Sequence, residues 1–432
     1  MTQGGKDKGR DADTAQLDLI PDDPKRPAPT RPEPPDDEPD AELPVDDDDA
    51  YAAFDDLEGE DDGGEEGPSG DVEGDADPWV GGQGTETEDW PAVTPDQIAA
   101  ELAARSEATS PIEVASLRPR QSLVAGVVLG GAIGDAMGHP TEFIGSLESI
   151  RSKYGPKGVT RFELYWDRDG RRFAPYTDDT QMAEIVLRSL VASRDAHDDL
   201  DAAMERMAEG FVEWSDHPQG GHRAPGNACM SGCRALARGV HWSEAGGATA
   251  GGCGSVMRAY PFGVLFADDL QRAERWSVEH SKLTHRDPIA LAACAAMAIG
   301  VARALRGDSV DMVVSEMVAA ACRYSAKTAA MMATAIDEAR SGVGPEITLD
   351  RLRAWAAHEA IAAGVYLFVR HPDDPVAAIL EGANTPGDSD SIATVAGALV
   401  GARTGAAAFP TEWIRDVERS AELVELAVRA AR

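Results

Sequence analysis

Apolar residues recur at helical intervals through most of the chain after about residue 118. The clearest stretches contain Met182, Ile185, Val186 and Leu190; Met312, Val313, Met317 and Val318; Leu352, Trp355 and Ala356; and the uncharged segment Pro288–Ala302. Three- and four-residue spacing is typical of amphipathic or buried helices. The best strand candidate is Val159–Trp166, which could equally be a loop. With no internal repeat, the pattern predicts one compact, all-α domain over residues 109–432.

Four glycines mark the first helix predicted in this domain. Gly126, Gly130, Gly134 and Gly138 lie four residues apart and therefore share one face of Val124–Gly138. Glycine in a helix interior costs about 1 kcal/mol relative to alanine. A stripe of them indicates that another backbone packs closely against this face. We expect a central helix of a tightly packed bundle.

Residues 1–108 have a different composition. The first 100 residues contain 32 acidic and 6 basic residues, and 13 of the chain's 27 prolines. Such a segment buries too little apolar area to offset the entropy of ordering, which predicts a disordered tail. The tail is either a solvating segment or an acidic arm that docks a basic protein partner. Thr94–Ser106 has helical spacing and is a candidate leading helix.

Charge and cysteine content exclude several classes of protein. A net charge of −36 argues against binding to a nucleic-acid backbone. We find neither a signal peptide nor an apolar run of the ~18–20 residues that span a bilayer, so no membrane association is expected. Five scattered cysteines are typical of a reducing, cytoplasmic compartment. Cys229 and Cys233 have a spacing open to zinc, but without a second ligand pair buried free thiols fit better.

Two acidic segments precede predicted helices. Thr177-Asp178-Asp179-Thr180 comes before the helix that contains Met182, and Asp388-Ser389-Asp390-Ser391 comes before Ile392–Ala402. Helix capping explains one such side chain at each helix start, but not four in a row at both. Oxygen ligands of this kind suit Mg²⁺ or Mn²⁺. If the segments meet in space, they could hold two metal ions about 3.5–4 Å apart.

At this point the chain resembles the ADP-ribosylglycohydrolases, a family that includes the dinitrogenase-reductase-activating glycohydrolase and the ADP-ribosyl-arginine and ADP-ribosyl-serine hydrolases. The resemblance spans about residues 120–405 and rests on five motifs in order: Gly130–Phe143, Thr177–Met182, Gly252–Arg258, Leu283–His285 and Gly387–Ile392. Any one of these motifs would be weak evidence, whereas the five together are specific.

The resemblance implies an all-α fold around a binuclear Mg²⁺ centre. It places six metal ligands in the two acidic segments: Thr177, Asp178, Asp179, Asp388, Asp390 and Ser391. It puts Glu142 beside the same centre, where the side chain gates or contacts the substrate ribose. The catalytic residues are then Glu142, Asp178 and Asp390. Asp135 is either a support for these ligands or a structural residue.

The resemblance also assigns binding of the substrate's nucleotide to the glycine-rich stretch. Gly252, Gly254 and Ser255 would let main-chain N–H groups approach the diphosphate. Arg258 is either a phosphate contact or a structural ion pair under this loop, and His285 either contacts the nucleotide or belongs to the core. Some relatives have asparagine in place of Cys253. Asp216 is the only acid near the position of a base proposed in some relatives, so the general base stays open.

These observations predict a metal-dependent hydrolase that removes ADP-ribose from a modified protein or small molecule by cleaving the bond at the anomeric carbon of the ribose. Two alternatives remain. One is a binuclear-metal phosphoesterase, which could use the same ligands. The other is a non-catalytic ADP-ribose-binding or toxin-neutralising protein. The sequence contains neither a nicotinamide fingerprint nor a P-loop.

Overall fold

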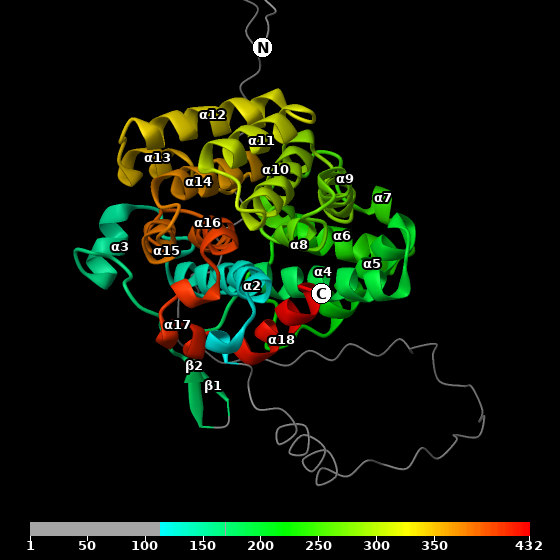
Figure 1. Cartoon of the computed structure of the whole chain (residues 1–432), viewed down its shortest axis with the longest axis horizontal. Coiled ribbons are helices and arrows are strands. Elements are labelled where there is room, and N and C mark those ends of the chain that lie inside the picture. Colours follow the sequence, from blue (N-terminus) through cyan, green and yellow to red (C-terminus); the bar gives the residue numbers. More distant parts are fainter. Residues whose placement is uncertain (1–112, 169) are drawn as a thin grey trace, which may run out of the picture. The chain divides into compact units, whose positions relative to one another are not determined.

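The computed structural model describes residues 113–432 apart from residue 169, and these residues form an almost wholly helical domain (Figure 1). The predicted tail and the candidate helix at Thr94–Ser106 lie outside the described residues, so the boundary at residue 108 stays a prediction. The first half of the domain contains η2 (Val114–Ser116), α2 (Pro119–Gly138), η3 (His139–Thr141), α3 (Leu147–Tyr154), β1 (Trp166–Arg168), β2 (Arg171–Phe173), α4 (Asp178–Ala196), α5 (Leu200–Asp216), α6 (Asn227–Ala237), α7 (Trp242–Ala245), η4 (Cys253–Ser255) and α8 (Tyr260–Leu265). The second half contains α9 (Leu270–Ser281), α10 (Pro288–Leu305), α11 (Val310–Cys322), α12 (Ala326–Arg340), α13 (Pro345–Arg351), α14 (Ala357–Arg370), α15 (Pro375–Ala383), α16 (Ser389–Thr404), η5 (Ala406–Ala408), α17 (Thr411–Asp416) and α18 (Ser420–Ala430).

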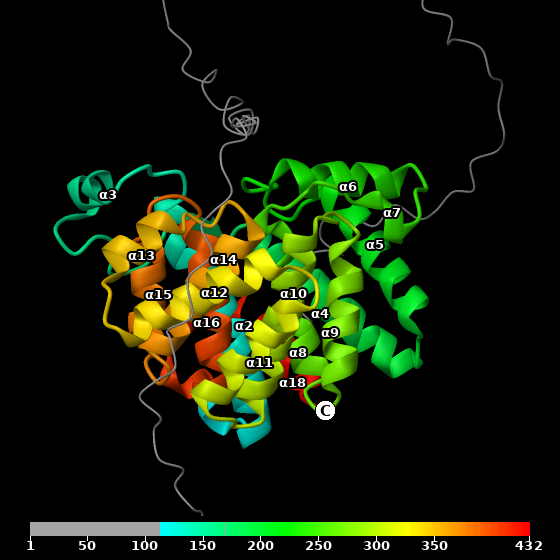
Figure 2. The ribbon, with the colours of Figure 1, turned by 90° about the horizontal axis from the view of Figure 1, so that it is seen from above.

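The glycine face of α2 packs directly on α16, as the stripe predicted. A Cβ atom added at Gly134 would lie 2.1 Å from the carbonyl oxygen of Ala393, and one at Gly130 would lie 2.2 Å from that of Gly397. The two helices run through the middle of the domain, and α14 and α15 pack against α16 (Figures 1 and 2). This close approach fixes the end of α2 against the start of α16.

The structure decides two local predictions, one for the segment after α13 and one for residues 159–165. The residues between α13 and α14 form a loop rather than the predicted helical turn. Ala354 in this loop has φ of 65°, and Ala356 pairs with Gly252 in an isolated bridge. The apolar spacing of Leu352 and Trp355 therefore reflects burial of a loop. Over 159–165 the chain takes the loop alternative, and β1 begins only at Trp166, paired antiparallel with β2.

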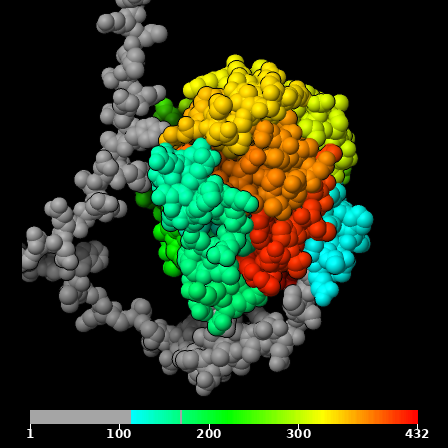
Figure 3. All heavy atoms as spheres, turned by 90° about the vertical axis from the view of Figure 1, so that its left-hand side faces the viewer, coloured from blue at the N-terminus to red at the C-terminus, as the bar shows by residue number. Residues whose placement is uncertain are grey.

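A cavity behind the second acidic segment lies between α3, α13 and α15, which are distant in sequence. Figure 3 shows the face on which α3 (teal) lies beside α13 and α15 (yellow to orange). Thr385 and Pro386, which lead into the acidic segment, line this cavity. The cavity therefore borders the loop that leads to Asp388.

Two core helices are long and apolar enough to cross a membrane by length and composition. They are Pro119–Thr141, which is α2 with η3, and α10. However, 83% and 78% of their most apolar windows are buried inside the domain. This burial is that of core helices.

Candidate metal centre

The first acidic segment is held in place by a carboxylate on α2. The Asp135 side chain accepts hydrogen bonds from Thr177 N at 2.8 Å, from Thr180 N at 3.0 Å and from Thr180 Oγ1 at 2.6 Å. Asp135 is fully buried, so these bonds tie the first turn of α4 to the central helix. It thus lies behind the candidate ligands and orients them.

Helix capping does not account for the acids of this segment. The cap of α4 is Thr177, whose hydroxyl accepts from Asp179 N at 3.3 Å. Asp178 is a buried residue, and its side chain is not the cap of α4. Burial and the charges of Asp390 and Asp135 disfavour its charged form, and a cation nearby would favour it.

The second acidic segment begins on a glycine turn. Gly387 has φ of 107°, and Asp388 N then donates to Arg353 O at 2.9 Å. Asp388 occupies the N-cap position of α16 but makes no capping hydrogen bond with its side chain. Ser389 turns the other way and donates to Gly138 O at 3.0 Å. Among the acids and hydroxyls of this segment, the Ser389 hydroxyl therefore links the start of α16 to the end of α2 by a hydrogen bond.

The structure brings the two acidic segments together. Ser391 Oγ donates to Asp179 Oδ2 at 3.0 Å, although 212 residues separate them along the chain. Cys253 Sγ, from the glycine-rich stretch, lies 2.7 Å from Asp388 Oδ2. The six residues expected to bind metal are all buried, namely Thr177, Asp178, Asp179, Asp388, Asp390 and Ser391. They form one cluster of oxygen donors.

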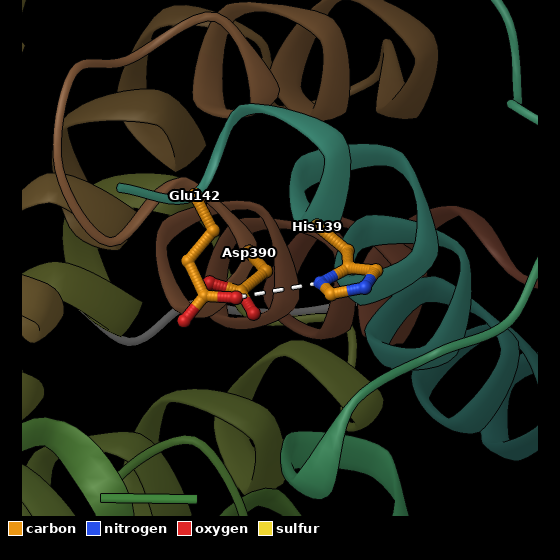
Figure 4. Close-up of side chains that lie close together, drawn as sticks. All are labelled: His139, Glu142 and Asp390. Atoms are coloured by element: carbon orange, nitrogen blue, oxygen red, sulfur yellow. Dashed lines mark hydrogen bonds and ion pairs between the residues drawn. The ribbon is translucent and has the colours of Figure 1, made fainter. Parts of the chain in front are cut away.

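Glu142 joins this cluster through the short segment after α2. Thr141 anchors the segment by donating to Ala383 O at 2.5 Å. Figure 4 shows Glu142 and His139 from this segment pointing toward Asp390 at the start of α16. His139 Nδ1 lies 3.3 Å from Glu142 Oε2, and one ligand atom from each of the three side chains lies within 4.8 Å of the others. They form a possible metal-binding group.

His139 is the residue at this site to which the sequence assigned no role. It stands inside the first motif, three residues before Glu142, which is the spacing that places two side chains on one side of a helical turn. This three-residue spacing was the feature of the sequence that could have identified His139 as part of the site. Burial lowers the pKa of His139, while the nearby Asp390 acts in the opposite direction.

Burial and mutual repulsion disfavour the charged forms of these acids. Burial, followed by the charge of Asp390, raises the pKa of Asp135 to about 7 and raises the pKa values of Asp178, Asp179, Asp388 and Glu142 in the same direction. Within the described part of the chain, the one ion-pair contact of these acids is that of Glu142 with His139, which is charged only when the ring is protonated. A divalent cation would supply the missing positive charge. The donor set therefore fits hard metal ions.

These pKa shifts predict how the stability of metal-free protein depends on pH. Above about pH 6.5, carboxyls and histidines of the unfolded chain have already lost their protons, whereas the buried acids of the folded protein still retain some. The folded state then binds more protons, so the free energy of unfolding should fall between pH 6.5 and 8. Mg²⁺ should oppose this fall and stabilise more at pH 8. Calorimetric melting in chelator and in Mg²⁺ measures both effects. Metal-free protein that gains stability over this interval would contradict the account.

The glycine-rich stretch lies beside the acidic cluster. Three side chains expected to contact the nucleotide are buried, namely Ser255, Arg258 and His285. Arg258 is fully buried, donates to the carbonyl of Gly254 and to Thr284 Oγ1, and lies 4.7 Å from the centre of the Phe211 ring. Ser255 Oγ accepts from Ser281 Oγ at 2.9 Å. These contacts favour a structural role for both side chains in supporting the loop.

His285 also packs against the back of this loop. Its Nδ1 lies 2.7 Å from Thr284 Oγ1, and burial lowers the pKa of the ring to about 3. A Cβ atom added at Gly254 would lie 3.0 Å from this ring and 2.5 Å from Cys229 Sγ, so glycine is required there. Gly252 is half-buried. Gly254 is buried and its carbonyl accepts from Arg258, so Gly252 is the more exposed of the two glycines.

The structure also locates three remaining candidates from the sequence: Asp216, Cys229 and Cys233. Asp216, the open candidate for a general base, is exposed at the end of α5, where Ser215 donates to it at 3.5 Å. It is not among the acids that raise the pKa values of the cluster. Cys229 and Cys233 are buried free thiols on α6, as their isolation in the sequence suggested.

Comparison with known proteins agrees with this geometry. The family model described as ADP-ribosylglycohydrolase matches residues 116–432. The ADP-ribosylarginine hydrolase Tri1 of Pseudomonas putida is 28% identical over 72% of this chain and 79% of its own length. The ADP-ribosyl-[dinitrogen reductase] glycohydrolase of Rhodospirillum rubrum is 26% identical over 69% and 90%.

A solved structure has the same fold. It is titled an ADP-ribosylglycohydrolase-related protein complex and superimposes with a TM-score of 0.55 at 24% identity, over 73% of this chain and 99% of its own. The family match covers most of the residues that the structure describes, including both acidic segments and the glycine-rich stretch. The chain therefore belongs to the ADP-ribosylglycohydrolases, hydrolases that act on glycosidic ADP-ribose linkages.

Proposed function

We propose that the protein is a binuclear, Mg²⁺-dependent hydrolase that releases ADP-ribose from a modified acceptor by cleaving the bond at the anomeric carbon of the ribose. The observation that carries this proposal is the convergence of Asp178 and Asp179 with Asp388, Asp390 and Ser391 in one buried cluster, whose acids form no ion pair with Lys or Arg among residues 113–432. Mn²⁺ has similar ligand preferences and is the second candidate ion.

The ligands of the two ions come from both acidic segments. Thr177, Asp178 and Asp179 would bind from the start of α4, and Asp388, Asp390 and Ser391 from the start of α16. When bound, the ions would lower the pKa of a coordinated water and orient the hydroxyls of the ribose. Asp135 keeps the first three ligands in register by fixing the backbone of Thr177 and the side chain of Thr180.

Glu142 follows the short helix η3, whereas the proposed metal ligands lie at the starts of α4 and α16. Its carboxylate faces Asp390 and is paired with His139 (Figure 4). We assign it to the substrate ribose, where a carboxylate stabilises developing positive charge at the anomeric carbon or relays a proton, as carboxyl pairs do in glycosidases. His139 holds the Glu142 carboxylate in place.

The glycine-rich stretch is assigned to the diphosphate. Cys253 N already donates to Trp355 O at 3.2 Å, which leaves the N–H groups of Gly252 and Gly254 as those proposed to meet the phosphates. Arg258 supports this loop by donating to the Gly254 carbonyl, so its positive charge lies on the buried side of the loop. At both glycines the Cβ position faces the His285 ring, so a ligand would be met by the main-chain N–H groups.

A substrate panel tests the proposal. The purified chain is offered ADP-ribosyl-arginine, ADP-ribosyl-serine and a generic phosphodiester with Mg²⁺, and released ADP-ribose is measured. The names of the two relatives favour an ADP-ribosylated protein as the natural substrate. Hydrolysis of at least one ADP-ribosyl compound is expected. Cleavage of the phosphodiester alone would identify a phosphoesterase, and tight binding of ADP-ribose without turnover would identify a binding protein.

The acidic tail is not expected to take part in the chemistry; it is either a solvating segment or an arm that docks a basic partner. A chain shortened to begin at Thr109 should fold and keep its turnover on a small ADP-ribosylated compound. Any loss should appear only with a basic protein partner and should weaken with salt, because exposed charges are screened beyond about 8 Å at physiological ionic strength. Turnover and circular dichroism of both chains provide the measurement. An unfolded or insoluble shortened chain would show that the tail is part of the fold.

A further inference from the structure

A cavity of about 760 Å³ opens between the hairpin of β1 and β2, α17 and the start of α18, which lie at the lower edge of the domain in Figure 1. None of the proposed metal ligands lines it. Its lining includes Phe173, Ile414 and Val424, and the first two are only half-buried, so apolar surface is left open to solvent. An open apolar cavity of this size on a folded domain indicates a docking site.

The part of the chain that the structure describes begins at the wall of this cavity, where Glu113, Val114 and Ala115 line it. Six residues, 107–112, connect them to the segment Thr94–Ser106, which lies outside the described residues. Six residues span at most about 22 Å when fully extended. A connection this short holds the segment near the cavity at a local concentration on the order of 1 mM. An unlinked partner would need a comparable concentration to compete.

The sequence of this segment predicts an amphipathic helix. Thr94 and Gln97 have the spacing of a capping box, and Pro95 occupies the first helical position, where proline is favoured. Ile98 and Leu102 lie four residues apart and therefore share one face. A helix this short is marginal in water and is stabilised chiefly by packing its apolar face on another surface. One helical turn, about 10 Å wide and about 5.4 Å long, fills about 420 Å³, so the cavity has room for nearly two turns.

The charges at the mouth of the cavity complement those of the segment. Arg171 and Arg415 are exposed and both pair with Asp416, at 3.8 and 2.6 Å, so two guanidinium groups share one carboxylate. The other lining charges over 418–422 are paired with opposite charges. The edge at the two arginines is therefore left with positive charge, and the segment offers two acidic residues against one basic residue.

We propose that Thr94–Ser106 docks in this cavity as a helix, with Ile98 and Leu102 against its apolar lining and the acidic side chains toward Arg171 and Arg415. The family match begins at residue 116, so the docked helix lies outside the part of the chain that the family model covers. Docking adds contacts to η2, α17 and α18 and thereby stabilises the domain. The candidate metal centre takes no part in it, so this inference is independent of the proposed function.

Hydrogen exchange of the full-length chain, followed by mass spectrometry, tests the proposal. The double variant Ile98→Asp with Leu102→Asp places two charges on the apolar face and should release the segment. We expect the amides over 411–424 to exchange at least about tenfold faster than in wild type, and the melting temperature to fall. Ala100→Asp with Ala104→Asp is the matched control, because these positions lie on the opposite face of the same predicted helix, and it should stay close to wild type.

The positive edge provides a second test from the side of the cavity. Arg415→Ala removes an exposed guanidinium group that belongs to no part of the candidate metal centre. It should speed the exchange of the same amides by a smaller factor than the apolar-face variant. The difference between Arg415→Ala and wild type should shrink as salt is added, because interactions between exposed charges are screened.

Three results would overturn the proposal. Unchanged exchange and melting in the variant of Ile98 and Leu102 would show that this segment does not occupy the cavity. Equal effects of both double variants would trace the change to added charge alone. Protection and a molecular mass that rise together with protein concentration would identify a second copy of the chain as the occupant. Far-ultraviolet circular dichroism checks that the domain stays folded. No reading depends on turnover, so failure of the proposed function would appear separately in the substrate panel.

Discussion

Asp178→Asn and Asp390→Asn should each lower turnover of an ADP-ribosylated substrate by at least about 100-fold, because a bound metal ion supplies several kcal/mol of charge stabilisation and 1.4 kcal/mol is a factor of ten. Asparagine keeps the shape of each side chain and removes its charge. The helices should persist, since Thr177 rather than Asp178 caps α4. Released ADP-ribose and far-ultraviolet circular dichroism are the two measurements.

The stability of Asp178→Asn separates metal binding from helix capping. In chelator the variant should melt at a higher temperature than wild type, because burial and the neighbouring acids disfavour the charged form of Asp178, a cost that asparagine does not carry. In Mg²⁺ the order should reverse, since wild type gains the free energy of binding: a ligand at about 100 times its dissociation constant stabilises by about 2.7 kcal/mol. A capping role would instead give a loss of about 0.5–2 kcal/mol in both conditions.

Asp199→Asn is the matched control for these variants. Asp199 caps α5 through a hydrogen bond from Ala202 N at 3.0 Å and is exposed. Its replacement tests the loss of one acid at a helix start away from the cluster. Turnover should be unchanged and the Mg²⁺-induced rise in melting temperature should be as large as in wild type. Equal damage from Asp178→Asn and Asp199→Asn would refute a special role for the cluster.

Gly134→Ala should destabilise the protein by about 1–3 kcal/mol or more, the cost of overpacking a filled core. The added Cβ atom would lie 2.1 Å from the carbonyl oxygen of Ala393, so α2 and α16 would have to move apart. Helix propensity alone predicts the opposite sign, a gain of about 1 kcal/mol. Denaturant unfolding of the variant and wild type decides between the two.

Gly226→Ala is the control for the glycine substitution. A Cβ atom at Gly226 meets nothing within 4 Å, and its φ of −60° suits any residue. Its stability should change little in comparison. Because Gly138 on the same stripe packs against the backbone of Asp390, we also expect Gly134→Ala to weaken binding of Mg²⁺. A Gly134→Ala protein as stable as wild type would show that the helices do not need this close contact.

The sequence predicted the helical class and the close packing around α2 because both depend on local periodicity. The apolar spacing in Pro288–Ala302 and the glycines of α2 are visible without a partner helix. The same signal failed at Leu352 and Trp355, since a buried loop that pairs with Gly252 also needs apolar side chains. Periodicity over so few residues does not distinguish a buried loop from a helical turn.

The candidate site was predictable in its residue types but not in its assembly. Four polar residues at each of two helix starts exceeded what capping requires, yet their meeting depends on packing between residues 212 positions apart. The charge of Arg258 suggested a phosphate contact, whereas its partners Gly254 and Thr284 become adjacent only in the folded chain. For His139, the sequence offered only its three-residue spacing from Glu142 as a signal.

Turnover before and after removal of metal tests the central claim most directly. The wild-type chain is treated with chelator, assayed on the ADP-ribosyl compound that it cleaves, and assayed again after Mg²⁺ is added. Release of ADP-ribose should stop in chelator and return with Mg²⁺ in wild type, and should not return in Asp390→Asn. Undiminished release in chelator, in wild type or in the variant, would contradict a metal centre formed by the two acidic segments.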